Sequence, residues 1–127
     1  MSLPKILVVE DDALLCFAME IALEHHGFEV IAASCASKAM NLLCDSTTRY
    51  DALITDIRLG DGDDGWSLAH QVRELVPEIA VVYVTGEGAP DWPRLGVSES
   101  VALQKPVHEA QLVDCISGLL SRRRKLN

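Results

Sequence analysis

The sequence lacks the cysteine spacing that would indicate a zinc site or a disulfide framework. No two of its four cysteines form a CxxC pair. They stand among apolar residues, at Cys16, Cys35, Cys44 and Cys115. We therefore expect reduced thiols in the core of a cytoplasmic protein, without a zinc knuckle or disulfides.

Basic charge and long hydrophobic runs are also scarce. Eleven Lys and Arg residues stand against nineteen Asp and Glu, and the net charge of −8 argues against nucleic acid or an anionic membrane as a partner. Hydrophobic runs such as those at 6–9 and 79–84 fall far short of the roughly 18 residues that span a bilayer, and no signal peptide precedes them. The 127 residues, 49% of them hydrophobic, make one globular domain and exclude a multidomain enzyme.

Short hydrophobic runs alternate with segments of helical period. The runs predict strands at 6–9, 29–32, 52–55, 81–84 and 101–104. The helices are expected to bury Leu14, Ala18, Ile21 and Ala22 in the first, Ala39, Leu42 and Leu43 in the second, Leu68, Ala69, Val72, Leu75 and Val76 in the third, and Leu112, Val113, Ile116, Leu119 and Leu120 in the last. Gly27 is expected just beyond the first helix, and Pro77 ends the third.

The strands show no polar alternation, so both of their faces are expected to be buried. This pattern predicts a parallel sheet with helices on both faces, and right-handed crossovers then give a doubly wound α/β fold. Ligands of such folds bind beyond the carboxyl ends of the strands. The residues that follow each strand should therefore carry the function.

Polar residues do follow every expected strand. They are Glu10-Asp11-Asp12, Ser34, Asp56, Thr85-Gly86 and Lys105-Pro106. Converging carboxylates repel one another and favour a divalent ion, and an all-oxygen set suits Mg²⁺ (or Mn²⁺) better than zinc. Asp56 ends the middle strand and is the natural nucleophile for a phosphoryl group. Thr85 and Lys105 offer a hydroxyl and a cation for the phosphoryl oxygens.

Four motifs in this order resemble the receiver domain of two-component response regulators, chemotaxis-type single receivers included. They are Val8-Val-Glu-Asp-Asp12, Ile54-Thr-Asp56, Val84-Thr-Gly86 and Gln104-Lys-Pro106. The resemblance runs from about residue 5 to residue 120. It implies a flavodoxin-like (βα)5 fold with strand order 2-1-3-4-5, a receiver domain at 4–121 and a basic C-terminal tail at 122–127.

The resemblance also implies roles for individual residues. Asp56 would be the phosphoacceptor, modified to 4-aspartylphosphate. Glu10, Asp11, Asp56 and the backbone carbonyl of Arg58 would bind the metal. Asp12 is expected to cap the first helix instead.

Around the phosphoryl group, the resemblance gives Thr85 and Lys105 the role of contacting its oxygens. The Lys105-Pro106 bond is expected to be cis. Arg58, Gly86 and Glu87 would modulate the reaction, and pairing of Arg58 with Glu87 over the phosphoryl group would shield it from water.

The function implied is that of a signalling module, not of an enzyme with a separate substrate. The chain would take a phosphoryl group from a histidine kinase or a histidine phosphotransfer protein and later lose it to water. As a stand-alone receiver it would signal by contact with an unidentified downstream protein or act as a phosphate sink. The alternatives are a piece of a longer regulator or hybrid kinase, and a degenerate receiver that binds proteins without phosphorylation.

Other readings of the sequence are weaker. A haloacid dehalogenase-type phosphohydrolase needs a second aspartate two positions after the nucleophile, where Arg58 stands. The segment 60–65 fits the GxGxxG string, but its aspartates would repel a pyrophosphate, and Gly65 stands where an EF-hand needs an oxygen ligand. The four histidines are scattered along the chain and are given no metal or phosphohistidine role.

The sequence departs from the family around the expected fourth helix. Receivers carry Tyr or Phe three residues before the conserved lysine, and here that position is Ala102. Glycines and prolines crowd the segment between Thr85 and Lys105, so we predict a fourth helix of one turn or none, capped near Asp91 with Pro93 in its first turn. Trp92 would either contact a partner or fill the gap beside the short helix.

Overall fold

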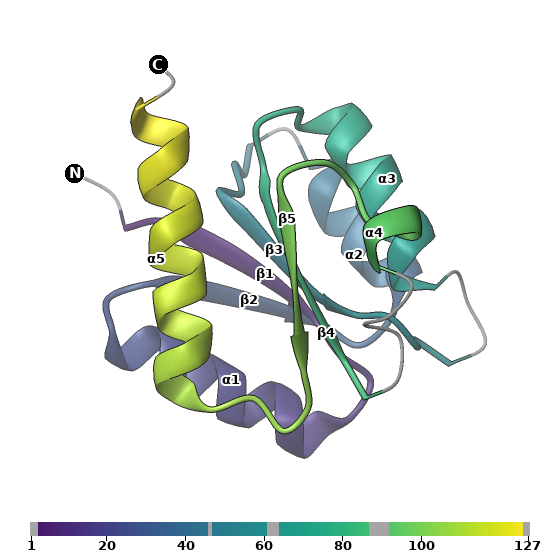
Figure 1. Ribbon diagram of the computed structural model, residues 1–127. Coiled ribbons are helices and arrows are strands. Elements are labelled where there is room, and N and C mark those ends of the chain that lie inside the picture. The colour runs from purple at the N-terminus through teal and green to yellow at the C-terminus, as the bar shows by residue number, and fades with distance from the viewer. Residues whose placement is uncertain (1–2, 46, 61–63, 87–91, 126–127) are drawn as a thin grey trace.

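The computed structural model describes residues 3–45, 47–60, 64–86 and 92–125, with the side chains of 123–125 left undescribed. Five parallel strands form one sheet in the order β2-β1-β3-β4-β5 (Figure 1). The strands are β1 Lys5–Val9, β2 Glu29–Ala33, β3 Ala52–Asp56, β4 Ala80–Thr85 and β5 Ser100–Gln104. Each expected strand is present, with ends that differ by at most one residue, and the doubly wound α/β fold is confirmed.

Helices cover both faces of the sheet, as Figure 1 shows. They are α1 Ala13–His25, α2 Ala36–Leu43, α3 Gly65–Leu75, α4 Trp92–Leu95 and α5 Glu109–Lys125. Within β1, Ile6 and Val8 pack in the cluster under α1 and α5, whereas Leu7 and Val9 pack in the cluster under α2 and α3. The strand reads as a continuous hydrophobic run because both of its faces are buried.

A side chain caps the start of α1, and a glycine follows its end. Asp12 is the N-cap of α1, as predicted, and its Oδ1 accepts from Leu14 N and Leu15 N at 3.0 and 3.2 Å. The helix ends at His25, and Gly27 follows with φ of +90°, a backbone conformation that glycine adopts without strain. The cap therefore places the residues before Asp12 at the carboxyl edge of the sheet.

Most of the buried face of α1 was predicted incorrectly, and of the four expected residues only Ala22 is buried. The buried residues of this helix are Cys16, Met19, Ala22 and Leu23. The expected face included Leu14 and Ile21, which are 79% and 50% exposed, and Ala18, which is also exposed. Apolar residues surround this helix on all sides, so its period does not specify which side meets the sheet.

The other helices follow their predicted faces more closely. All five apolar residues expected of α5 are buried. In α3, Leu68, Ala69 and Val72 are buried, but Leu75 at the helix end is half exposed. The helix α5 continues to Lys125, so the basic residues 122–125 lie at its end.

The cysteines are free, and only one lies in the core. Cys16 is buried, Cys35 and Cys115 are intermediate, and Cys44 is exposed. The expectation of core thiols is therefore confirmed for Cys16 and in part for Cys115, which packs against the cluster under α1 and α5, but was wrong for Cys35 and for Cys44, the C-cap of α2. Among the described residues, no helix is long and apolar enough to cross a membrane.

The fourth helix is a single turn, as predicted from its glycines and prolines. The expected cap, Asp91, lies outside the described residues. Trp92 is half-buried, packs against the cluster under α2 and α3, and donates from Nε1 to Ser100 Oγ at 2.9 Å. This contact favours the interpretation in which Trp92 fills the gap beside the short helix.

An aromatic ring from β4 lies beside the position where the family has one on β5. Tyr83 is fully buried, pairs in register with Ala102, and contacts the Trp66 ring at a centroid distance of 4.6 Å. Its hydroxyl accepts from Val97 N at 3.0 Å. Tyr83 thus ties the strand that ends in Thr85 to the segment after α4.

Candidate functional site

The strand order brings the polar strand ends together at one edge of the sheet. Strand β3 pairs with β1 on one side and with β4 on the other, so Asp56 lies between the ends of these two strands. Strand β5 pairs with β4, and Lys105 N donates to Thr85 O at 2.8 Å. Residues separated by up to 95 positions in sequence order, from Glu10 to Lys105, therefore share one site.

Three carboxylates converge there. A ligand oxygen of each of Glu10, Asp11 and Asp56 lies within 4.8 Å of those of the other two. Glu10 and Asp56 are almost completely buried, at 2% and 8% exposure, and Asp11 is exposed. The clustering expected of these three residues is present.

Lys105 reaches two of the three carboxylates. Its Nζ donates to Asp56 Oδ2 at 2.8 Å and lies 3.2 Å from Glu10 Oε1. Burial acts to lower the pKa of Lys105, but the two carboxylates outweigh it and raise that pKa above its ordinary value. The Lys105-Pro106 peptide bond is cis, as expected.

Burial disfavours the ionised form of Glu10. Burial raises its pKa to about 7 from an ordinary 4.5, and the Asp56 charge adds to the rise, while the hydrogen bond from Asp12 N opposes it. Its Oε1 is buried, and apart from the Lys105 ammonium 3.2 Å away no described residue donates a hydrogen bond to it. A buried carboxylate oxygen of this kind, beside two further carboxylates, fits a hard divalent cation.

The raised pKa of Glu10 predicts the pH dependence of stability in the absence of divalent ions. Between pH 4.5 and pH 7 Glu10 is protonated in the native state but ionised in the unfolded chain. The free energy of unfolding should therefore fall as the pH rises from about 4.5 to about 7. The contribution is at most about 1.4 kcal/mol for each pH unit. Urea unfolding in EDTA across this range should show a shallower decline for Glu10→Gln, and parallel curves for parent and variant would contradict the assignment.

The backbone after β3 holds the Asp56 carboxylate from the other side. Arg58 N donates to Asp56 Oδ1 at 3.2 Å, and the Arg58 side chain is exposed. Thr85, at the end of β4, is buried, and Gly86 beside it is exposed. Glu87 lies outside the described residues, so its pairing with Arg58 stays a prediction.

Gly65 is a site residue that the sequence interpretation missed. It begins α3 directly after the N-cap Asp64, and its N–H donates to Ile57 O at 2.7 Å. A Cβ on Gly65 would overlap the backbone of Asp56 and Ile57. The only local sign in the sequence was a glycine after an N-capping aspartate. It does not indicate that Gly65 packs against the end of β3.

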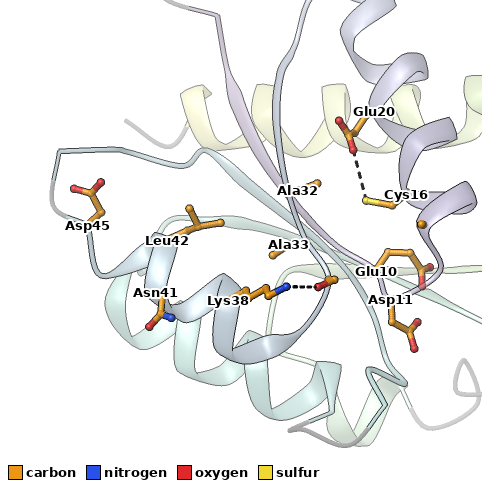
Figure 2. A pocket seen from close by; sticks show the side chains of 12 residues that line it. Glu10, Asp11, Cys16, Glu20, Ala32, Ala33, Lys38, Asn41, Leu42 and Asp45 are labelled. Carbon is orange, nitrogen blue, oxygen red and sulfur yellow. Dashed lines mark hydrogen bonds between the residues drawn. The ribbon is translucent and has the colours of Figure 1, made fainter.

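A cavity of about 650 Å³ opens beside the carboxylates, between α1 and α2 (Figure 2). Glu10 and Asp11 line one end, and Lys38 and Asp45 of the α2 side line the other. Burial, reinforced by Glu20, raises the pKa of Cys16 to about 11, so this thiol in the wall stays protonated at neutral pH. The cavity leaves one side of the acidic group accessible to a ligand.

Known proteins share both the sequence pattern and the fold. Residues 6–117 match the family described as the response regulator receiver domain. The chain belongs to this family. It is therefore a receiver domain of two-component signalling, and the family is one of signalling modules.

Solved structures agree with this assignment. A response regulator receiver protein from Sinorhizobium medicae is 38% identical, with a TM-score of 0.90 over 95% of this chain and 97% of that one. A CheY-like receiver domain protein from Methanospirillum hungatei is 26% identical, with a TM-score of 0.87 over 99% of this chain and 100% of that one. The five-stranded sheet of this chain, with its order β2-β1-β3-β4-β5, thus belongs to a receiver fold.

Curated relatives are longer than this receiver. The transcriptional regulatory protein PrrA of Mycobacterium leprae is 31% identical over 124 residues, which are 96% of this chain and 52% of PrrA. The alginate biosynthesis transcriptional regulatory protein AlgB of Pseudomonas putida is 32% identical over 85% of this chain and 24% of AlgB. The chain spans about half or less of the length of these relatives.

Proposed function

We propose that this receiver accepts a phosphoryl group on Asp56 from a phosphohistidine of a histidine kinase or a histidine phosphotransfer protein. The observation that carries the proposal is the convergence of Lys105 and three carboxylates on one strand edge, with Asp56 between its neighbours. A degenerate receiver would have no need to keep this arrangement. The retained set therefore favours phosphorylation over the phosphorylation-independent alternative.

The acidic group is proposed to hold Mg²⁺ (or Mn²⁺). Glu10, Asp11, Asp56 and the backbone carbonyl of Arg58 would be its protein ligands, and the bound ion would neutralise charge on the phosphoryl oxygens. Lys105 is already within hydrogen-bond distance of Asp56, and Thr85 ends the neighbouring strand. These two residues would donate to the oxygens of the transferred group.

The proposed transfer is an in-line displacement at phosphorus. One Asp56 carboxylate oxygen forms the new O–P bond as the P–N bond to the donor imidazole breaks. The bonding pair stays on that nitrogen, and the ring leaves as neutral imidazole because its other nitrogen already carries a proton. Lys105 Nζ, 2.8 Å from Asp56 Oδ2, stabilises the negative charge that remains on the phosphoryl group. Hydrolysis later returns the Asp56 carboxylate and inorganic phosphate.

Acetyl phosphate tests this function without a protein donor. With Mg²⁺ present, intact mass spectrometry should show one added phosphoryl group, borohydride reduction should map it to Asp56, and EDTA should abolish it. Mg²⁺ alone should also stabilise the parent chain by about 1.4 kcal/mol near ten times its Kd, because it binds only the folded site. Labelling that is equal in EDTA, or that maps elsewhere, would overturn the proposal.

The donor is proposed to dock on the exposed side of α1. Leu14, Phe17 and Ile21 are 79%, 59% and 50% exposed, and they lie on the helix that starts directly after the acidic pair. A donor histidine that reaches Asp56 must therefore lie close to this face. The apolar stripe offers that donor a hydrophobic contact surface.

Phe17→Ser should slow phosphotransfer from a phosphorylated histidine phosphotransfer protein by about tenfold or more, since aromatic residues are common interface anchors. Its labelling by acetyl phosphate should equal that of the parent, because Phe17 is not part of the acidic group. Leu75→Ser removes an equally exposed apolar side chain from α3 and serves as the matched control. Equal transfer rates in all three proteins would rule out docking on α1.

The remaining sequence expectations stay part of this proposal. They are a receiver domain at 4–121, a cytoplasmic location, no nucleic acid or membrane partner, and output through a protein contact or a phosphate sink. Because Ala102 has no ring to move, we place the coupling of Thr85 to the output face in the segment from Gly86 to Gly96. The Tyr83 hydroxyl accepts a hydrogen bond from Val97 N directly after this segment. Arg58 and Glu87 are proposed to set the lifetime of the phosphoryl group.

A further inference from the structure

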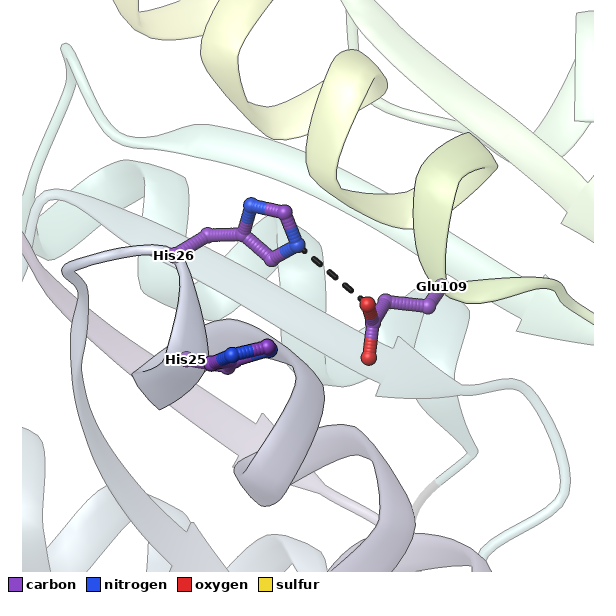
Figure 3. A group of neighbouring side chains, drawn as sticks. All are labelled: His25, His26 and Glu109. Carbon is purple, nitrogen blue, oxygen red and sulfur yellow. Dashed lines mark hydrogen bonds and ion pairs between the residues drawn. The ribbon is translucent and has the colours of Figure 1, made fainter.

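Two imidazoles and a carboxylate meet at the end of α1 that lies opposite Asp12. His25 is the last residue of α1, His26 is its C-cap, and Glu109 is the first residue of α5. A ligand atom of each lies within 4.8 Å of those of the other two, and His26 Nε2 is 3.3 Å from Glu109 Oε2. Figure 3 shows the Glu109 carboxylate directed toward the two rings.

We propose that His25, His26 and Glu109 form a binding site for a borderline transition-metal ion, Zn²⁺ in the first instance. Two imidazole nitrogens and one carboxylate oxygen are the donors of open zinc sites with three protein ligands. Mg²⁺ prefers an all-oxygen set, which this group does not provide. The chain therefore carries two cation sites of different ligand chemistry, and this second site is independent of phosphorylation.

The side chains of His25, His26 and Glu109 need only small rotations to bind an ion. Bonds of about 2.0 to 2.1 Å in a tetrahedral site put ligand atoms about 3.3 Å apart, so the group must contract by at most about 1.5 Å. All three residues are exposed, so their side chains can rotate without repacking the core. The two rings already lie at 66° to each other with centroids 5.5 Å apart, which leaves both free to direct a nitrogen toward one point.

The ion pair between His26 and Glu109 explains only part of this cluster. It engages two of the three residues, and an exposed pair of this kind contributes little to stability. A bound ion would use His25 as well and would keep one or more positions for water. It would also connect α1 to α5, because its ligands come from both helices.

Titration of the full chain with Zn²⁺ tests the site, with Mg²⁺ in excess to saturate the carboxylates at the other end of α1. The ring signals of His25 and His26 in NMR spectra should shift or broaden at stoichiometric Zn²⁺, and those of His70 and His108 should not. His25→Gln and His26→Gln should each weaken the calorimetric affinity by at least about tenfold, because loss of even an outer-shell partner costs about 10- to 100-fold. Glu109→Gln should also weaken the calorimetric Zn²⁺ affinity.

His108→Gln is the matched control, since it removes an exposed histidine beside Glu109 that is not part of the group. The variants should keep the parent's labelling by acetyl phosphate, which shows that they are folded. An unchanged Zn²⁺ affinity in the double variant of His25 and His26 would overturn the proposal. So would Zn²⁺ shifts confined to Cys35, Cys44 or the group around Asp56.

Discussion

Asp56→Asn is expected to take up no phosphoryl group from acetyl phosphate, because a carboxamide lacks the anionic oxygen that forms an acyl phosphate. Intact mass spectrometry with Mg²⁺ should show labelling of the parent and none of the variant. Asp12→Asn is the matched control. It changes a neighbouring aspartate to another good N-cap, and Asp12 already accepts from two amides of α1, so this variant should be labelled like the parent.

The Asp56→Asn variant should also change the pKa of Glu10. The Asp56 charge contributes to the raised pKa of Glu10, so Asp56→Asn should bring that pKa down from about 7. Carboxylate chemical shifts followed through a pH titration in EDTA measure this change. If the variant is labelled as the parent is, Asp56 is not the acceptor, whatever happens to the pKa of Glu10.

Gly65→Ala is expected to lower both stability and phosphorylation. The added methyl group overlaps the backbone of Asp56 and Ile57, which are not flexible side-chain ends, and overpacking of this kind costs about 1 to 3 kcal/mol of unfolding free energy. Urea unfolding measures the loss. Since the Asp56 backbone must shift to accept the methyl group, labelling by acetyl phosphate should also be slower under conditions in which the variant remains folded.

Gly118→Ala is the control for the backbone effect of replacing glycine. Gly118 lies within α5, and its added Cβ would meet nothing within 4 Å. That variant should gain about 0.5 to 1 kcal/mol, because alanine favours the helix more than glycine does. A Gly65→Ala protein as stable and as rapidly labelled as the parent would show that the close contact with β3 is not required.

Much of the site was predictable because each part of it is local in sequence. Asp56 and Thr85 each end a strand, and Glu10 and Lys105 directly follow one. Parallel strands present their carboxyl ends at one edge, so residues at these positions must lie near one another. The short α4 was predictable for the same reason, since the glycines and prolines act on the backbone next to them.

The sequence by itself determined the parallel sheet, the identity of its strand-end residues, the caps of α1 and the single turn of α4. Only the tertiary structure decided which side of α1 is buried, that Gly65 contacts the end of β3, and that Glu109 meets His25 and His26 across 83 positions of chain. The physical reason is that periodicity and capping act within a few residues. The orientation of a helix that is apolar all round, and the contacts between distant segments, depend on how the whole chain packs.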